Sequence, residues 1–390
     1  MGRCRVFEPV SAQTVARKVL RKVLRKAVRK GVRNRVRKGV RKVARVWALM
    51  LFAATAAAPV SAQTLPTFTA TERASILRHG PWPPPLARDP ANAQDGRAQA
   101  IALGRRLFFD PSLSAEGDLS CASCHDPATA FQDGRRTPKY GTRNTPSLLD
   151  VAQQRWFGWG GASDSLWAAS LAPMSSANEM GPPRLDSATL IQHAKALAAY
   201  QATLVSPRTT FDAFRDALAR GDSRAAAAYP LAAQRGLRIF VGEGRCNVCH
   251  SGPLFSNGEF ADIGVPFFVP DGVDSGRHDG LKSLMTSVHN RLGPHNDAGA
   301  ARDPRAVLTR QLDMQPRHFG EFRVPGLRNV ANTAPFMHDG SLPTLADVVR
   351  HYSELNEERL HADGERILRP LKLTAEQTAD LVAFLQSLSR

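Results

Sequence analysis

Residues 121–125 read Cys121-Ala122-Ser123-Cys124-His125, a Cys-x-x-Cys-His sequence that is typical of covalent attachment of c-type haem. In such a motif two thiols bond to the haem vinyl groups, and the adjacent imidazole is placed to bind the iron. A second copy reads Cys246-Asn247-Val248-Cys249-His250. A zinc or redox site is the alternative for one copy, but two copies behind an export signal favour haem. We therefore expect two covalent haems, with His125 and His250 as iron ligands.

Only five cysteines occur in the 390 residues, and four of them belong to the two motifs. The fifth, Cys4, lies in a segment that we expect to be removed. Because no cysteine is left for a disulfide, the sequence predicts that core packing and the haems supply the stability.

An export signal is predicted upstream of the first motif. Residues 46–58 form an apolar run that is short for a membrane span, basic residues precede it, and Val60-Ser61-Ala62 provides small residues at a cleavage position. This pattern predicts a signal peptide cut after Ala62, so that residues 1–62 are removed; an uncleaved anchor is the alternative. We expect a periplasmic protein with no stable membrane span after cleavage.

The net charge of +17 is concentrated at one end of the chain. Residues 1–45 hold 17 Lys and Arg against one acid, whereas the other 345 residues carry 35 basic and 34 acidic side chains. The body of the protein is therefore close to neutral, and the sequence predicts no nucleic-acid partner.

The two halves of the chain repeat one plan. Gly104-Arg105-Arg106-Leu107-Phe108 precedes the first motif, and Gly236-Leu237-Arg238-Ile239-Phe240 precedes the second. An internal repeat of this kind favours two related haem domains. We expect an N-terminal haem domain at 96–225 and a C-terminal one at 226–390, behind an extended leader at 63–95 in which the proline cluster Pro81–Pro85 excludes a helix.

The predicted fold class is mainly α: two cytochrome c-like haem domains with long loops and little strand. Residues 251–335 are rich in Gly, Pro and Asp, so they are expected to be mostly loop, wrapping a haem and forming an interface. Apolar periodicity, alanine content and the capping box of Thr374 and Gln377 predict helices at 96–109, 187–204, 211–235, 345–352 and 374–388.

Further stretches carry a recognisable pattern over residues 95–390: Leu107-Phe108-Phe109-Asp110, Phe131-Gln132-Asp133-Gly134, Arg143-Asn144-Thr145-Pro146-Ser147-Leu148, Asn178-Glu179-Met180-Gly181, Val324-Pro325-Gly326-Leu327-Arg328-Asn329-Val330 and Thr333-Ala334-Pro335-Phe336-Met337-His338-Asp339-Gly340. With them the chain resembles the bacterial di-haem cytochrome c peroxidase family, including its MauG branch. The resemblance implies that the N-terminal haem meets hydrogen peroxide and that the C-terminal haem handles electrons.

Peroxide chemistry needs an open iron face and a group that moves a proton. The resemblance implies that Glu179 is this acid/base group; a surface carboxylate is the alternative. Ordinary members cap the N-terminal haem with a second histidine near the position of Gly141, but no histidine occurs between His125 and His193. We therefore expect a first haem that is open, or holds only water, at rest.

Trp159 matches the family's tryptophan between the haems, which relays electrons; packing as a buried aromatic is the alternative. The family usually reads Trp-Asp-Gly-Arg, whereas this chain reads Trp159-Gly160-Gly161-Ala162. Trp156 and Trp167 are close in sequence and either join the relay or pack. The resemblance also implies one calcium ion, held by the Asn144 side chain and the backbone carbonyls of Thr333 and Pro335.

The distal ligand of the second haem separates the branches of the family. Ordinary peroxidases place a methionine fourteen residues beyond the histidine of the Ala-Pro-x-x-His motif, and MauG-like proteins place a tyrosine there. Counting from His338 gives Tyr352. A phenolate favours ferric and higher-valent iron, so Tyr352 favours the MauG branch. His351 and Met337 are rival ligands.

The resemblance leads to three functional hypotheses. In the MauG mode, high-valent iron shared by both haems oxidises a side chain of an external partner protein. In the second, peroxide is detoxified with electrons from a small periplasmic donor protein. The third is a di-haem electron carrier without catalysis, which would not need Glu179. MauG-type members present a surface tryptophan where this chain has Gly244, so any exit for electron hopping lies elsewhere.

Overall fold

The structure is a computed structural model that describes residues 68–136, 143–182, 184–266, 268–269, 272–360, 363–364 and 367–390. Cys4 and the predicted signal peptide lie outside the described residues. Cleavage after Ala62 and export therefore stay predictions.

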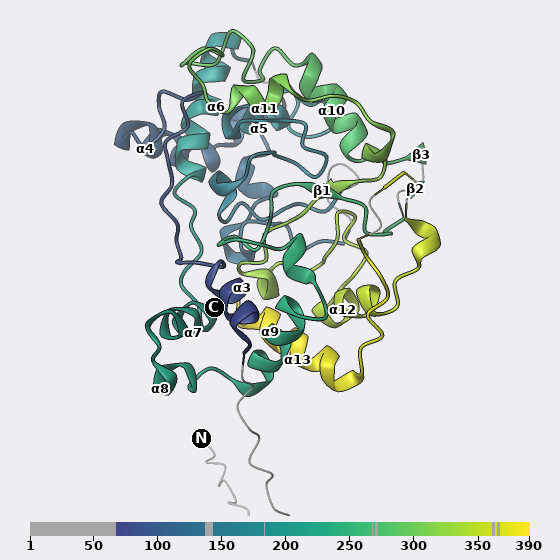
Figure 1. The fold of residues 1–390 in the computed structure, drawn as a ribbon. Helices are drawn as coiled ribbons and strands as arrows, with labels where there is room; N and C mark the ends of the chain where they lie inside the picture. The colour runs from purple at the N-terminus through teal and green to yellow at the C-terminus, as the bar shows by residue number, and fades with distance from the viewer. Residues whose placement is uncertain are drawn as a thin grey trace, which may run out of the picture. The chain divides into compact units, whose positions relative to one another are not determined.

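Helices dominate the regular structure, as predicted (Figure 1). Within the described residues, strands form two short antiparallel pairs: β1 (Phe260–Ala261) with β4 (Phe322–Arg323), and β2 (Phe268–Val269) with β3 (Gly272–Val273). Short 3-10 helices interrupt the loops: η1 (Pro111–Leu113), η2 (Cys121–Ser123), η3 (Pro127–Thr129), η4 (Val151–Gln153), η5 (Cys246–Val248), η6 (Pro316–His318), η7 (Val330–Asn332) and η8 (Glu357–Arg359).

The first hydrophobic cluster forms where α4 (Ala98–Phe108) and α5 (Leu166–Ser175) pack on α6 (Ser187–Gln201). The Asp186 side chain caps α6 by accepting a hydrogen bond from the Thr189 backbone N–H at 2.9 Å. The helices predicted at 96–109 and 187–204 are confirmed. Buried members of this first cluster include Leu107, Phe108, Leu113, Trp167, Leu171, Met174, Met180 and Leu197.

The second hydrophobic cluster centres on the pair α9 (Leu231–Val241) and α13 (Ala375–Gln386). The predicted capping box begins α13: the Thr374 hydroxyl accepts from the Gln377 N–H at 3.2 Å, and the Gln377 side chain accepts from the Thr374 N–H at 2.9 Å. Around this pair lie α3 (Ala70–Leu77), α7 (Thr210–Arg220), α8 (Ser223–Ala226) and α12 (Leu345–Ser353), and buried members include Ile76, Phe211, Phe214, Leu237, Phe240, Phe255 and Phe384.

The repeated glycine marks the same kind of helix crossing in both clusters. A Cβ added to Gly104 of α4 would lie 2.0 Å from the Ala196 carbonyl oxygen of α6. A Cβ added to Gly236 of α9 would lie 2.0 Å from the Asp380 carbonyl oxygen of α13. Only glycine allows the two backbones to approach this closely. The Gly-x-x-(Leu/Ile)-Phe repeat therefore produces the same close helix crossing in both clusters.

The leader is not extended throughout, which corrects one expectation. Residues 63–95 include α3, which begins with a capping box between Thr69 and Glu72 and buries Ile76. Trp82, in the proline-rich stretch, is 2% exposed, and its indole N–H donates to the Ser206 carbonyl at 2.9 Å. The helix ends before Pro81–Pro85, which is not helical, as predicted. The large apolar ring of Trp82 is buried rather than left on the surface.

The helix α7 lies before the predicted boundary at 225/226 but packs with residues that follow the boundary. The segment predicted to be helical at 211–235 is divided between α7, α8 and the start of α9, with turns at Gly221 and Pro230. Phe211 and Phe214 of α7 belong to the second cluster, not the first. The boundary at 225/226 and the assignment of two haem domains stay predictions.

Residues 287–303 of the second half lie against the first half. The buried Arg291 guanidinium lies 2.6 Å from Asp303 and 2.8 Å from Asp89. Lys195 of α6 lies 2.6 Å from Asp297. The segment is flanked by α10 (Arg277–Thr286) and α11 (Ala306–Arg310), which lie beside α5 and α6 in Figure 1. The loop-rich region thus forms an interface, as expected, although it also contains these two helices.

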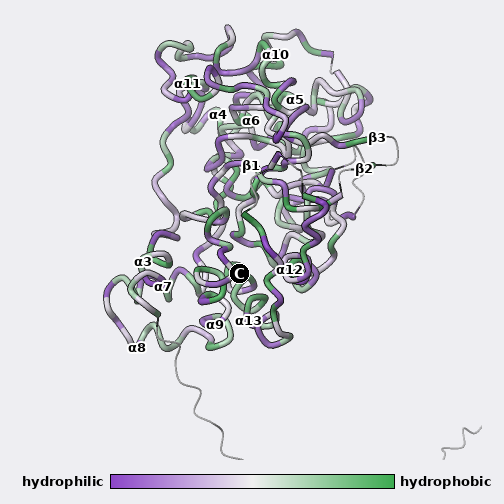
Figure 2. Tube along the Cα trace, turned by 45° about the vertical axis from the view of Figure 1, so that its right-hand side comes forward, coloured by the Kyte–Doolittle hydropathy of each residue, from purple (hydrophilic) through white to green (hydrophobic). Residues whose placement is uncertain are grey.

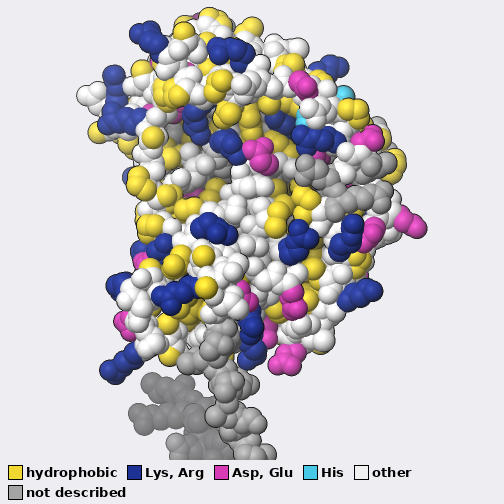
Figure 3. Space-filling model, viewed as in Figure 1, with side chains coloured by type: hydrophobic (Ala, Val, Ile, Leu, Met, Phe, Trp, Pro, Cys, Tyr) yellow, Lys and Arg dark blue, Asp and Glu magenta, His cyan; other side chains and the backbone are white. Residues whose placement is uncertain are grey.

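No helix among the described residues is long and apolar enough to cross a membrane. The longest described helix, α6, has 15 residues, and Figure 2 shows apolar and polar residues interspersed along the chain. On the face shown in Figure 3, basic side chains are spread over the surface with acidic and apolar ones between them.

Replacing Gly236 by Ala is expected to destabilise the protein by about 1–3 kcal/mol, because the added methyl group meets a backbone carbonyl that cannot move alone. Helix propensity by itself predicts the opposite sign, since Ala is favoured over Gly by about 1 kcal/mol. Denaturant unfolding followed by circular dichroism measures the change. Ala102→Gly on the exposed face of α4 is the control for propensity, and a more stable Gly236→Ala variant would contradict the crossing.

Candidate functional site

The two Cys-x-x-Cys-His motifs fold into the same turn. Each begins as a single 3-10 turn, η2 or η5, and the histidine N–H donates to the carbonyl of the first cysteine: His125 to Cys121 and His250 to Cys246, both at 2.9 Å. Within the described residues the motif cysteines form no disulfide. Burial raises the pKa of the Cys121 and Cys246 thiols to about 12. Each motif therefore brings two neutral thiols and one imidazole together.

Both histidines are oriented by a backbone carbonyl. The His125 Nδ1 lies 2.9 Å from the Phe131 oxygen, and the His250 Nδ1 lies 3.0 Å from the Phe255 oxygen. A carbonyl only accepts, so Nδ1 carries the proton and Nε2 is left with a lone pair for a metal. Burial also lowers the pKa of both histidines, which favours the neutral ligand form. The motifs therefore fit the group that their sequence predicts.

The two residues whose carbonyls accept from the histidines, Phe131 and Phe255, have a left-handed backbone conformation that residues other than glycine seldom adopt. Phe131 has φ +59° and Phe255 has φ +55°. The Phe131 ring packs edge-on against Phe108 at 6.1 Å, and the Phe255 ring packs against Phe240 at 6.0 Å. The repeated phenylalanine thus supports the residue that orients the histidine. Sequence reasoning missed this contact because a backbone carbonyl has no residue signature.

Tyr352 lies near the two cysteines of the second motif. It is on α12, it is half-buried, and burial together with the nearby Cys246 and Cys249 thiols raises its pKa. The rival His351 places its Nε2 2.7 Å from the Ile263 carbonyl, so that nitrogen already has a partner. Met337, the other rival, is half-buried, and its carbonyl accepts from the Asn144 amide at 3.2 Å. These contacts favour Tyr352 over His351.

Glu179 lies in a tight turn that follows α5. The Gly181 N–H donates to the Ser176 carbonyl at 2.8 Å, and the Met180 carbonyl accepts from the Ala115 N–H at 2.9 Å. Met180 is buried in the first cluster, which fixes its neighbour. The Glu179 side chain as a whole is exposed, but the protein around its carboxyl removes enough solvent to raise its pKa. A carboxyl of this kind keeps its proton to a higher pH than usual.

Asn144 joins the two halves around Trp159. The Trp159 indole N–H donates to the Asn144 carbonyl at 2.7 Å, and the Asn144 N–H donates to the His338 carbonyl at 2.7 Å. The Asn144 amide nitrogen donates to the Pro335 carbonyl, also at 2.7 Å. Asn144, which in the sequence resembles an ordinary turn residue, thus holds Trp159, the predicted relay tryptophan, against the second half.

The three predicted calcium ligands lie in this region of the structure. Asn144 is buried, and its side-chain oxygen has no hydrogen-bond partner. Its amide is next to the Pro335 carbonyl, and Thr333 is half-buried two residues earlier. Among the described residues no group of three or more His, Cys, Asp or Glu side chains could hold a metal ion. The oxygen donors fit a hard cation, and calcium binding stays a prediction.

Each tryptophan in the described part of the chain has a cation near its ring. Trp156 and Trp167 are 5% and 1% exposed, so both pack in the interior.

Gly244, at the position where MauG-type members present a surface tryptophan, is tightly packed, since an added Cβ would lie 2.7 Å from the Ile239 carbonyl oxygen. Gly141, where a second histidine would be expected, lies outside the described residues.

Comparison with known proteins gives consistent matches. A family model for di-haem cytochrome c peroxidase matches residues 98–193. The methylamine utilization protein MauG of Methylorubrum extorquens is 32% identical over 318 residues, covering 74% of this chain and 78% of that protein. The cytochrome-c peroxidase IdrP1 of Pseudomonas sp. (strain SCT) is 31% identical over 353 residues, covering 79% and 85%.

A solved structure of similar fold is a MauG-like protein associated with microbial copper homeostasis. It has a TM-score of 0.59 and 25% identity and covers 80% of this chain and 95% of that chain. Proteins of this family are haem oxidoreductases, and membership implies two haem c groups, in agreement with the two motif turns. The prediction from the sequence is confirmed: the chain is an enzyme that belongs to the di-haem cytochrome c peroxidase family.

Proposed function

We propose that the chain is an exported, periplasmic peroxidase of the MauG mode. Hydrogen peroxide is the substrate at the first motif, and the second motif relays electrons between that site and an external protein. The observation that carries this proposal is the setting of Tyr352, which lies beside Cys246 and Cys249 while the neighbouring His351 is bonded elsewhere. An anionic oxygen ligand favours oxidised iron, as storage of oxidising equivalents requires.

Two cytochrome c-like units are part of the proposal. Each hydrophobic cluster contains one glycine-mediated helix crossing and adjoins one Cys-x-x-Cys-His turn with the same histidine–carbonyl contact. This duplication supports one haem in each unit. Asn144 and Trp159 lie between the units, which supports an electron path through this contact.

Glu179 is proposed to move the proton at the first site. Reduction of one hydrogen peroxide consumes two electrons and two protons and gives two waters. The bound haem supplies the electron-transfer chemistry. The Glu179 carboxylate would accept a proton from one peroxide oxygen and return it to the other oxygen, which leaves as water. Its raised pKa suits a group that must both take and return a proton.

An ordinary peroxidase that detoxifies peroxide is the second candidate. IdrP1, named a cytochrome-c peroxidase, is as similar to this chain as MauG is. In this reading a small donor protein supplies both electrons. The third hypothesis, an electron carrier without catalysis, leaves the carboxyl of Glu179 without a role.

The mature protein is expected to begin near Gln63 and to carry two haems. Intact-mass spectrometry of protein made in a host with c-type haem maturation measures both. Replacing Cys121 and Cys124 by Ala should remove only the first haem, and replacing Cys246 and Cys249 only the second, because each turn holds its own thiols. A mass with one haem, or with residues 1–62 retained, would refute this expectation.

Glu179→Gln should retain both haems and slow the reaction with peroxide by about 10²–10⁴, the usual contribution of a positioned acid/base. Stopped-flow spectroscopy of the ferric protein measures the rate. Because the pKa of Glu179 is raised, the wild-type rate should titrate above the ordinary glutamate range, and this titration should vanish in Glu179→Gln. Glu116→Gln, an exposed carboxyl near the same turn, is the control, and equal rates in all three proteins would exclude the role.

Tyr352→Phe should change the low-spin signal of the ferric protein in electron paramagnetic resonance and abolish stable storage of both oxidising equivalents, while the first haem still binds small ligands. Tyr352→Met should raise the potential of the second haem and favour ordinary peroxidase behaviour. Tyr200→Phe, a buried tyrosine of the first cluster, is the matched control. A Tyr352→Phe spectrum identical to that of wild type would support the second candidate function instead.

A further inference from the structure

Arg323 is a buried cation that no carboxylate of the described residues balances. It is 5% exposed. Its Nε donates to the Gly158 carbonyl at 3.3 Å, and its Cζ lies 5.9 Å from the centre of the Trp159 ring. Within the described part of the chain its two Nη atoms make no hydrogen bond. Loss of solvent lowers the pKa of Arg323 to about 10, and no carboxylate opposes that effect.

Other buried arginines of this chain do have carboxylates nearby. They are Arg277 near Glu259, Arg291 with Asp303, and Arg328 with Asp212. Removing a guanidinium from water is unfavourable unless an anion and hydrogen bonds replace the solvent. Arg323 differs from these arginines because no carboxylate of the described residues lies near its guanidinium.

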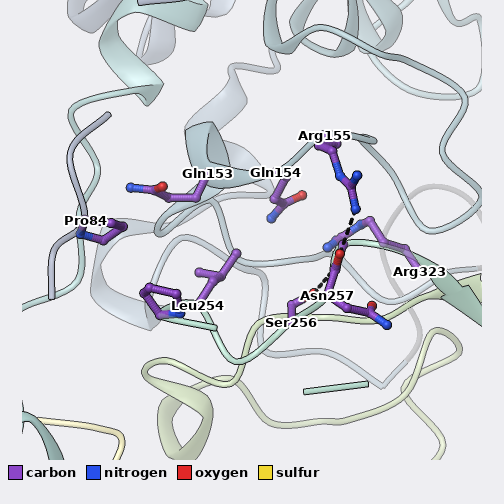
Figure 4. Close-up of a pocket in the computed structure, with 10 residues that line it drawn as sticks. Pro84, Gln153, Gln154, Arg155, Leu254, Ser256, Asn257 and Arg323 are labelled. Atoms are coloured by element: carbon purple, nitrogen blue, oxygen red, sulfur yellow. Dashed lines mark hydrogen bonds between the residues drawn. The ribbon is translucent and has the colours of Figure 1, made fainter. Parts of the chain in front are cut away.

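The Arg323 side chain lines a cavity of about 180 Å³ between the two halves (Figure 4). Leu254 and Ser256, which directly follow the second haem motif, form another wall of this cavity. Arg155 also lines it, but its guanidinium is bonded to the Asn257 carbonyl and to Glu259. Arg323 is thus the lining cation with unused donors within the described residues.

The backbone around Arg323 is tied to the loop that orients His250. The Ser256 hydroxyl donates to the Val324 carbonyl at 2.7 Å, and the Val324 N–H donates to the Glu259 carbonyl at 2.8 Å. The carbonyl of Phe255, one residue before Ser256, accepts from the His250 ring. The backbone that carries Arg323 is therefore tied to the loop that orients His250.

We propose that Arg323 binds a propionate carboxylate of the second haem at the contact between the two halves. A guanidinium matches a carboxylate with two parallel N–H donors, and the two Nη atoms are available for this contact. A free small anion such as phosphate has the same chemistry, and the experiment distinguishes the two sources. The inference rests on attachment of the second haem, which family membership implies, and not on ligation by Tyr352.

The test uses the loaded protein and three variants, Arg323→Gln, Arg323→Lys and Arg155→Gln. Mass spectrometry first establishes that each carries two haems. Spectroelectrochemical titration then gives both haem potentials at one pH. Removing a cation from a carboxylate stabilises ferric iron, so Arg323→Gln should lower the potential of the second haem by several times the change in Arg155→Gln. Arg323→Lys keeps the charge and should restore most of the potential.

Resonance Raman spectra separate direct contact from a charge acting at a distance. A propionate bending band should shift in Arg323→Gln and stay unchanged in Arg155→Gln, because only the former loses hydrogen bonds to the carboxylate. Unchanged propionate bands in Arg323→Gln would overturn the proposal. So would a saturable phosphate-induced shift of the second haem in wild type that is lost in Arg323→Gln, because this result assigns the site to a free anion.

Discussion

The closest approach of two helices in each hydrophobic cluster is the constraint on which the site depends. A backbone carbonyl of α6 or α13 occupies the space that a side chain at Gly104 or Gly236 would need. Four residues later on the same helix, a phenylalanine enters the core and packs against the residue whose carbonyl orients the iron ligand. The helix crossing and the orientation of the histidine imidazole therefore depend on the same short helical segment. Its two copies explain why the repeat includes both the glycine and the phenylalanine.

The contact between the halves uses polar atoms where each half internally uses apolar ones. Asn144 meets the carbonyls of Pro335, Met337 and His338 and presents its own carbonyl to the Trp159 indole. Hydrogen bonds have direction, so they fix the position of an aromatic ring more narrowly than apolar contact does. The Arg323 cation acts on a ring that is already held in place.

Residue types predicted the covalent chemistry well, because two cysteines and a histidine at fixed spacing have few other uses. Mainly helical structure, the α13 capping box and the family also followed from local pattern. The burial of Trp82 and the membership of α7 in the second cluster did not, since both depend on contacts between residues more than a hundred positions apart. The carbonyls of Phe131 and Phe255 were beyond any sequence argument, because every residue has one. Arg323 has no distinguishing neighbour in sequence and becomes informative only through the partner that it lacks among the described residues.

The packing of residues 287–303 against the first half affects the order in which the chain can complete its folding. Synthesis proceeds from the N-terminus, so Asp89 and Lys195 emerge about a hundred residues or more before Arg291 and Asp297, their partners. Until then the first Cys-x-x-Cys-His turn belongs to a half whose outer layer is missing. Closure of the first half around this turn therefore waits for the second half.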